Sequence, residues 1–185
     1  MNYFVKDLMV PISEYATVPK GSTLFQAVLA LEKAQEEYNQ AKYIHRAVLV
    51  MDRKNRVVGK LSQLSVLRAL EYGNEQKQKV ESIGQFGFSS KFISSMREQH
   101  RLENTTLKDI CSQPAKMKVE NFMKTPSENE FIEEDTPVEA AIHQLQIGPY
   151  LSLLVTRKKD IVGILRLSDV FASVFHAMKE NELSE

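Results

Sequence analysis

The sequence predicts an α+β fold, an α/β sandwich of two pseudo-symmetric β-α-β-β-α repeats with a helical connector inserted between them. Three observations predict it. The stretch GKLSQLSVL at 59–67 returns as GILRLSDVF at 163–171, an offset of 163 − 59 = 104. Upstream, VKDLM at 5–9 returns as VENFM at 119–123. Within each copy a helical apolar pattern precedes two short apolar runs, and such a repeated unit organises the whole chain.

The repeat divides the chain into four parts: repeat 1 at 1–74, a partly helical connector at 75–118, repeat 2 at 119–180 and a flexible tail at 181–185. Residues 22–28 match residues 135–141 at an offset of 135 − 22 = 113. The offset falls to 104 at the closing turn, so repeat 1 holds 113 − 104 = 9 extra residues, around KAQEEYNQA at 33–41.

Each repeat opens with a short start segment (VKDLM at 5–9 or VENFM at 119–123), followed by an extended piece (YATV at 15–18 or EFIE at 130–133) and a helix. Thr23 and Thr136 can each supply a side-chain oxygen that caps the helix, and Pro137 is predicted at the first helical position, which proline favours. Apolar residues at helical spacing predict one buried face for each helix. They are Leu24, Ala27, Val28 and Leu31 in the first, and Val138, Ala141, Ile142 and Leu145 in the second.

Two apolar strands and a closing helix complete each repeat. The strands are RAVLVM and RVVGKL in repeat 1, and YLSLLV and DIVGIL in repeat 2. Polar residues at 52–55 and 157–159 separate them, which favours hairpin turns. The closing helix carries Val66, Leu67 and Leu70 in repeat 1, and Val170, Phe171, Val174 and Phe175 in repeat 2.

The connector at 75–118 has no counterpart in the repeat. The stretch 87–104 is predicted to hold a helix that begins near Ser89 or Ser90, and TTLKDI at 105–110 is predicted to be a helical turn with Thr106 and Asp109 in capping-box spacing. Two interpretations stay open. The segment either packs on the repeats as a plain connector, or acts as a flap over a ligand or a docking element for a partner.

Composition and motifs narrow the function classes. Lys plus Arg and Asp plus Glu both number 24, so no net charge draws the chain to DNA or to an anionic membrane. No apolar run approaches the ~20 residues of a membrane helix, and no secretory signal opens the chain, so we expect a cytoplasmic protein. Cys111 is the single cysteine, and the four histidines lack metal-ligand spacing. No nucleophile elbow, P-loop or Gly-rich dinucleotide loop is present, so we expect neither a metal site nor an enzyme.

The closing turn of each repeat is the candidate ligand site. An apolar strand ends there and a helix begins, and a helix N-terminus presents unsatisfied N–H groups and a positive dipole end that favour phosphate. A carboxylate in the first helical turn can accept hydrogen bonds from a pair of sugar hydroxyls. A hydroxyl or guanidinium three residues earlier can bind phosphate oxygens.

The doubled order of elements and the turn G-apolar-x-S/T-x-x-D resemble the CBS domain (cystathionine-β-synthase domain), and the tandem pair resembles a Bateman module. The resemblance implies an adenosine-type ligand, AMP, ADP or ATP, with S-adenosylmethionine or NAD less favoured and no obligatory cofactor. It also implies a homodimer and an unidentified partner protein that the module regulates. The helices expected at 23–42, 65–72, 136–147 and 168–178 supply the apolar contact of that dimer.

In the family this turn's Asp holds a ribose and the Ser/Thr before it contacts phosphate. Repeat 2 has Asp169 at the first position, but Arg166 at the second. Repeat 1 has Ser62 at the second position, but Ser65 at the first. We expect the main site at repeat 2, because a carboxylate binds a diol more strongly than a hydroxyl does and arginine offers phosphate a charge-assisted hydrogen bond.

Four more residues belong to the candidate set. Ser168 precedes Asp169, and residues before the second strand also reach phosphates in the family, a position held by Arg46, beside His45, in repeat 1 and by Tyr150 in repeat 2.

Structural roles are open alternatives for four of the candidates. Ser62 can simply cap its helix, and Asp169 can simply complement a helix dipole. Arg166 can be a solvated surface residue, and His45 a surface or half-buried histidine. The functional alternatives are a dimerisation or interaction protein that has lost nucleotide binding and, more remotely, an enzyme that uses the cleft between the repeats.

Overall fold

The computed structural model describes residues 3–37, 44–71, 95, 106–148 and 150–182. The helix predicted within 87–104 therefore falls outside the described residues, apart from residue 95. The boundaries proposed at 74/75, 118/119 and 180/181 stay predictions.

Repeat 1 forms a three-stranded sheet in the order β2-β3-β4. The strands are β2 (Thr17–Pro19), β3 (Ala47–Met51) and β4 (Val57–Ser62). β2 runs parallel to β3, and β3 and β4 form the predicted antiparallel hairpin. Asn55 turns the hairpin with φ 56°, and the Asp52 carboxylate accepts hydrogen bonds from the Lys54 and Arg56 amides at 2.8 and 2.9 Å.

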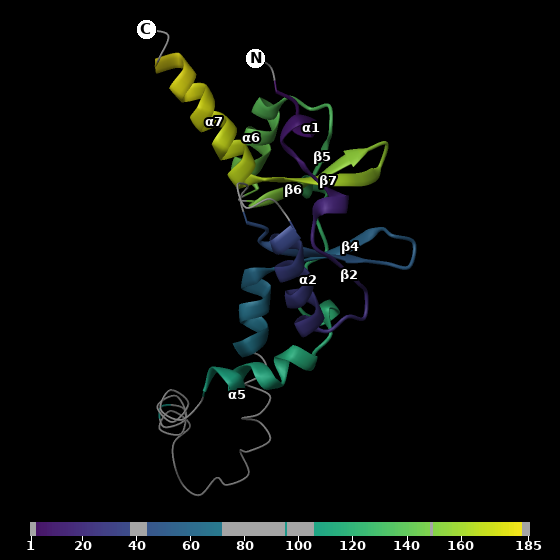
Figure 1. Ribbon diagram of the computed structural model, residues 1–185. Coiled ribbons are helices and arrows are strands. Elements are labelled where there is room, and N and C mark those ends of the chain that lie inside the picture. The colour runs from purple at the N-terminus through teal and green to yellow at the C-terminus, as the bar shows by residue number, and fades with distance from the viewer. Residues whose placement is uncertain (1–2, 38–43, 72–94, 96–105, 149, 183–185) are drawn as a thin grey trace, which may run out of the picture.

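Repeat 2 forms the same sheet with one strand added. β5 (Phe131–Glu133) runs parallel to β6 (Ser152–Arg157), and β6 pairs antiparallel with β7 (Asp160–Arg166), as predicted. The fourth strand, β1 (Val10–Pro11), comes from the start of the chain and pairs antiparallel with β7, which gives the order β1-β7-β6-β5. The two sheets lie one above the other along the long axis of the molecule (Figure 1).

Four longer helices follow the predicted pattern: α2 (Leu24–Glu37), the helix at 63–71, α6 (Val138–Ile147) and α7 (Leu167–Glu182). Their burial matches the prediction only in part. On α6, Val138, Ala141 and Leu145 are buried, but on α2 and α7 several predicted core residues face outward because the sheets already cover the opposite side. These exposed side chains are Val28, Phe171 and Phe175.

The helix starts differ between the repeats. The Gln26 amide donates to Thr23 Oγ1 at 3.2 Å and the Thr23 amide donates to Gln26 Oε1 at 2.8 Å, so Thr23 caps α2 as predicted. The prediction for α6 is wrong. Pro137 is the N-cap residue rather than the first helical residue, and no side chain caps this helix. The Tyr3 carbonyl accepts the hydrogen bond of the first helical amide instead, at 3.0 Å.

The start segments of the two repeats are exchanged. The first start forms α1 (Val5–Leu8), which lies beside α6 and β5 of repeat 2 (Figure 1), and Val5 is buried in the core of that repeat. The second start forms the 3-10 helix η3 (Val119–Asn121), and Val119 is buried in the core of repeat 1. Each repeat therefore completes its core with a segment that belongs, by sequence, to the other.

The described end of the connector confirms one prediction. Helix α5 (Leu107–Ser112) begins after Thr106, whose side chain accepts a hydrogen bond from the Asp109 amide at 3.3 Å, and the Asp109 carboxylate accepts one from the Thr106 amide at 3.1 Å. The 3-10 helix η2 (Pro114–Lys116) then leads into the second start.

A third buried cluster joins the two sheets. It contains Leu49 from β3, Leu154 from β6 and Ile164 from β7, together with Val10 and Tyr15, which follow the first start. The strands meeting here are buried on both faces, which explains why their sequences are continuously apolar.

Candidate functional site

The turn between β7 and α7 holds a buried ion pair. Arg166 ends β7 and Asp169 lies in the first turn of α7. Arg166 Nε and Nη2 donate to the two Asp169 carboxylate oxygens, each at 2.6 Å, and Arg166 is only 4% exposed. This bidentate arrangement is the strongest geometry available to the two groups.

Repeat 1 contributes a histidine to this pair. Arg166 Nη1 lies 3.3 Å from Nδ1 of His45, which is 0% exposed. A guanidinium can only donate, so Nδ1 acts as the acceptor and the neutral ring carries its proton on Nε2. The Tyr15 ring meets the imidazole edge-on, with the centroids 4.6 Å apart. The structure thus brings together three predicted residues, Asp169, Arg166 and His45, and adds Tyr15, which sequence reasoning missed because nothing in its local pattern distinguishes it from a core aromatic.

Burial changes the titration of this cluster. It raises the pKa of Tyr15 to about 12, so the phenol stays protonated. Burial, and then the Arg166 charge, lower the pKa of His45 below its ordinary value of 6.5. The cluster is therefore neutral overall near pH 7, with one cation and one anion.

Two structural alternatives for these residues are wrong. Arg166 is not a solvated surface residue, and His45 is neither a surface nor a half-buried histidine. A buried arginine is tolerated only when it is paired, and Asp169 supplies the pairing charge from three residues further along the chain.

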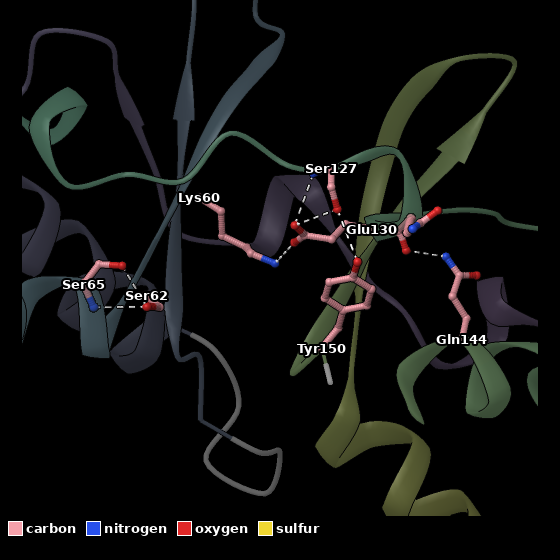
Figure 2. Close-up of polar contacts among 8 residues, drawn as sticks. Lys60, Ser62, Ser65, Ser127, Glu130, Gln144 and Tyr150 are labelled. Carbon is pink, nitrogen blue, oxygen red and sulfur yellow. Dashed lines mark hydrogen bonds and ion pairs between the residues drawn. The ribbon is translucent and has the colours of Figure 1, made fainter. Parts of the chain in front are cut away.

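The equivalent turn in repeat 1 is uncharged. The Ser65 amide donates to Ser62 Oγ at 3.1 Å, and the two hydroxyl oxygens are 3.0 Å apart (Figure 2). Ser62 therefore caps the helix at 63–71, as the structural alternative predicted. Ser65 is buried.

Tyr150 belongs to a separate polar network that links the repeats (Figure 2). Its hydroxyl lies 3.3 Å from Ser127 Oγ, and the Ser127 amide donates to Glu130 at 3.2 Å. Glu130, in the 3-10 helix η4 (Glu128–Glu130), accepts a hydrogen bond from Lys60 of β4 at 2.5 Å. Both members of this ion pair are mostly buried. Sequence reasoning missed them, although a lysine inside the apolar run VVGKL was a visible signal.

The two remaining candidates lie at the edges of these networks. Arg46 is exposed, and its carbonyl accepts a hydrogen bond from the Gln63 amide at 3.1 Å. Ser168 is half-buried in the first turn of α7. Within the described part of the chain, no three His, Cys, Asp or Glu side chains gather to hold a metal ion. None of the helices described has the length and apolar character needed to span a bilayer.

These features define a class of protein: a tandem pair of β-α-β-β-α units that meet across a buried interface. Sequence comparison names the family. A family model of the CBS domain matches residues 5–72 and 119–176, well over half of the chain. The chain belongs to the CBS domain family.

Three solved structures illustrate the shared fold, each matched over 94% or more of both chains. CBSX2, crystallised in complex with AMP, has a TM-score of 0.58 and 18% identity, with 95% of this chain and 98% of that chain covered. A CBS domain-containing protein of unknown function from Bacillus anthracis has a TM-score of 0.60 and 18% identity over 94% of each chain. A putative acetoin utilization protein from Vibrio cholerae has a TM-score of 0.61 and 17% identity over 100% and 99%. Identities this low establish the fold alone. No curated protein sequence matches significantly.

Proposed function

We propose that this CBS pair is a regulatory module that binds an adenosine-type nucleotide, AMP, ADP or ATP, between its repeats, mainly at the repeat-2 turn. Binding alters the packing of the two repeats, and the activity of a partner protein responds to the altered packing. The module carries out no reaction of its own. It acts in the cytoplasm as a homodimer.

The observation that carries the proposal is the position of Asp169, in the first turn of α7 directly after a buried strand. A carboxylate can accept about four hydrogen bonds. Arg166 uses one lone pair on each Asp169 oxygen, so the geometry is compatible with a ribose diol on the same carboxylate. A phosphate group would compete with His45 and Asp169 for the Arg166 guanidinium. The AMP complex of CBSX2, which has the same fold, makes AMP the first ligand to test.

Titration calorimetry and thermal unfolding with AMP, ADP, ATP and adenosine test the proposal. A ligand at about 100 times its Kd adds about 2.7 kcal/mol of stability. NAD and S-adenosylmethionine serve as comparison ligands. Absence of binding by every one of these compounds at millimolar concentration would contradict nucleotide sensing.

Matched variants locate the site. Asp169→Asn keeps the shape of the side chain but removes its charge, and we expect it to weaken binding far more than Ser65→Ala does. Circular dichroism confirms that both variants are folded. Equal losses would contradict a main site at repeat 2.

One observation favours the alternative, an interaction protein of the same fold without a ligand. The polar side chains of both turns already bind one another, through the Arg166–Asp169 ion pair in repeat 2 and the Ser62–Ser65 hydroxyl contact in repeat 1. A protein of this kind would show no nucleotide-dependent stabilisation and would still form its dimer.

A further inference from the structure

His45 lies at the junction of the two repeats. It precedes β3 of repeat 1, and its backbone amide donates to Gln35 Oε1 of α2 at 2.7 Å, which anchors it to that repeat. Its ring faces β7 of repeat 2, with Nδ1 3.3 Å from Arg166 Nη1. His45 and Arg166 are separated by 121 positions in sequence, so their contact depends directly on how the two repeats pack against each other.

The charged and titratable groups around the ring come from both repeats. Repeat 2 supplies Arg166 from β7 and Asp169 from α7. Repeat 1 supplies Tyr15, whose ring meets the imidazole edge-on, and Glu14, whose backbone and exposed carboxylate each favour the protonated ring. With a neutral imidazole, Arg166 and Asp169 cancel. A proton on Nδ1 would remove the acceptor of Arg166 and place a second cation beside the guanidinium in a fully buried position, where charge repulsion is poorly screened.

We propose that His45 is a pH-sensitive link between the two repeats, intact while its imidazole is neutral and weakened when mild acid protonates it. The link forms without a nucleotide, because it uses only side chains of the chain itself, and a phosphate group bound to Arg166 would compete with it. It makes the relative packing of the repeats respond to pH across the range in which histidine titrates.

The direction of the effect follows from the environment. Burial, and then Arg166, hold the pKa of folded His45 below 6.5. The unfolded chain therefore binds more protons than the folded chain between the folded pKa and 6.5. The stabilising contribution is complete above pH 6.5 and declines as the pH falls toward the folded pKa.

Nuclear magnetic resonance on the unmodified chain tests the link directly. We expect the His45 ring to exist as the Nε2–H tautomer and to titrate below the ordinary histidine pKa of 6.5. We also expect the Arg166 Nε–H signal to move with the same midpoint as His45, because the contact joins them. A His45 midpoint at or above 6.5, or an Arg166 signal that does not change as His45 titrates, would overturn the proposal.

Urea unfolding of a matched pair of variants gives an independent test. Glutamine does not titrate, and its oxygen can accept the Arg166 hydrogen bond, so His45→Gln should flatten the fall in urea midpoint between pH 7.5 and pH 5.5. His143→Gln, at an exposed position, is the matched control for the loss of a histidine. An unchanged slope in His45→Gln would refute the proposal, and if that variant does not fold, the resonance experiment decides alone.

Discussion

At the scale of single residues, Gly59 and Gly163 show why the closing turns of the two repeats share a glycine. A Cβ on Gly59 would lie 2.2 Å from Met123 Sδ, and a Cβ on Gly163 would lie 2.8 Å from Met9 Sδ. Each methionine ends an exchanged start, VKDLM or VENFM, so it covers the last strand of the opposite repeat. The glycines are needed because the methionine side chains cross the strand at close range. Backbone conformation does not require glycine, since the φ values of Gly59 and Gly163 lie outside the left-handed region.

Alanine at the two glycines should cost different amounts of stability. At Gly163 the new Cβ also lies 2.7 Å from the Val10 carbonyl, which is backbone, whereas at Gly59 the nearest atoms belong only to the flexible Met123 side chain. We expect Gly163→Ala to lose about 2–3 kcal/mol and Gly59→Ala about 1 kcal/mol. Urea unfolding measures both.

The double variants provide the control for this prediction. Met123→Ala should offset part of the cost of Gly59→Ala, while Met9→Ala should offset little of the cost of Gly163→Ala, since the carbonyl contact remains. The opposite ranking would show that the thioether contacts, rather than the backbone contact, decide.

At the scale of elements, the two repeats start equivalent helices by different means. Thr23 caps α2 with its own side chain, but α6 receives its first hydrogen bond from the Tyr3 carbonyl. The sequence offers a threonine at both places, so local pattern alone predicted two equal caps. The exchanged start decides otherwise, because it brings a backbone carbonyl to α6.

Removing the two threonine side chains tests this difference. Thr23→Ala should lower the free energy of unfolding by about 1 kcal/mol, the usual cost of losing a helix cap. Thr136→Ala should change it by less than about 0.5 kcal/mol, as for a substitution that removes no specific contact. Comparable losses in thermal unfolding would show that Thr136 supports α6 in a way that the hydrogen bonds do not account for.

The Lys60–Glu130 ion pair connects β4 of repeat 1 to η4 of repeat 2, with side chains 16% and 13% exposed. Burial tends to raise the pKa of Glu130, but the hydrogen bonds and charge of Lys60, with help from Ser127, outweigh it and leave the pKa below 4.5. The pair's contribution is therefore complete above pH 4.5 and is lost as the pH falls through the folded pKa.

Glu130→Gln should therefore destabilise the protein at pH 7 by about 3 kcal/mol, because it leaves Lys60 buried without its charge partner. The difference between variant and wild type should shrink at pH 3, where the wild-type carboxylate begins to protonate. Urea unfolding at both pH values measures it. A difference that stays constant with pH would mean that the carboxylate is not the group responsible.

At the scale of the whole molecule, the exchanged starts tie the repeats together. Val5 lies in the core of repeat 2, and the amides of Val5 and Lys6 donate to the carbonyls of Thr136 and Glu134 at 2.9 Å. Val119 lies in the core of repeat 1, and its amide donates to the Ser22 carbonyl at 3.0 Å. Neither repeat, cut out at the boundaries of the sequence match, would contain its complete core.

Core truncation should therefore act on the distant repeat. Val5→Ala should cost about 2 kcal/mol for the methyl groups lost and reduce amide-exchange protection most in β5, β6 and α6. Val119→Ala should act most strongly on β3, β4 and α2. Loss of protection confined to the repeat that contains the substitution in sequence would contradict the exchange.

The outward faces of the helices bear on the proposed homodimer. Phe171 and Phe175 on α7 are 66% and 57% exposed, and Phe25 on α2 is similarly exposed. We expect Phe171→Glu with Phe175→Glu to convert the dimer to a monomer in sedimentation velocity experiments. Leu107→Glu, at an exposed position on α5 outside these helices, is the matched control and should leave the dimer intact. A wild-type monomer would contradict the homodimer outright.

The sequence by itself determined the duplicated unit, the two hairpins and the caps at Thr23, Ser62 and Thr106. These features depend on residues close together in the chain, so periodicity and turn chemistry are enough to predict them. Asp169 and Arg166 could be identified as candidates from the sequence for the same reason, since they lie three residues apart in one turn. Only the tertiary structure decided that Arg166 is buried, that His45 meets it from the other repeat and that the starts are exchanged. Those contacts join residues far apart in the chain, such as Arg166 and His45 or Lys6 and Asp135. They follow from how two completed units bury their remaining apolar faces against each other.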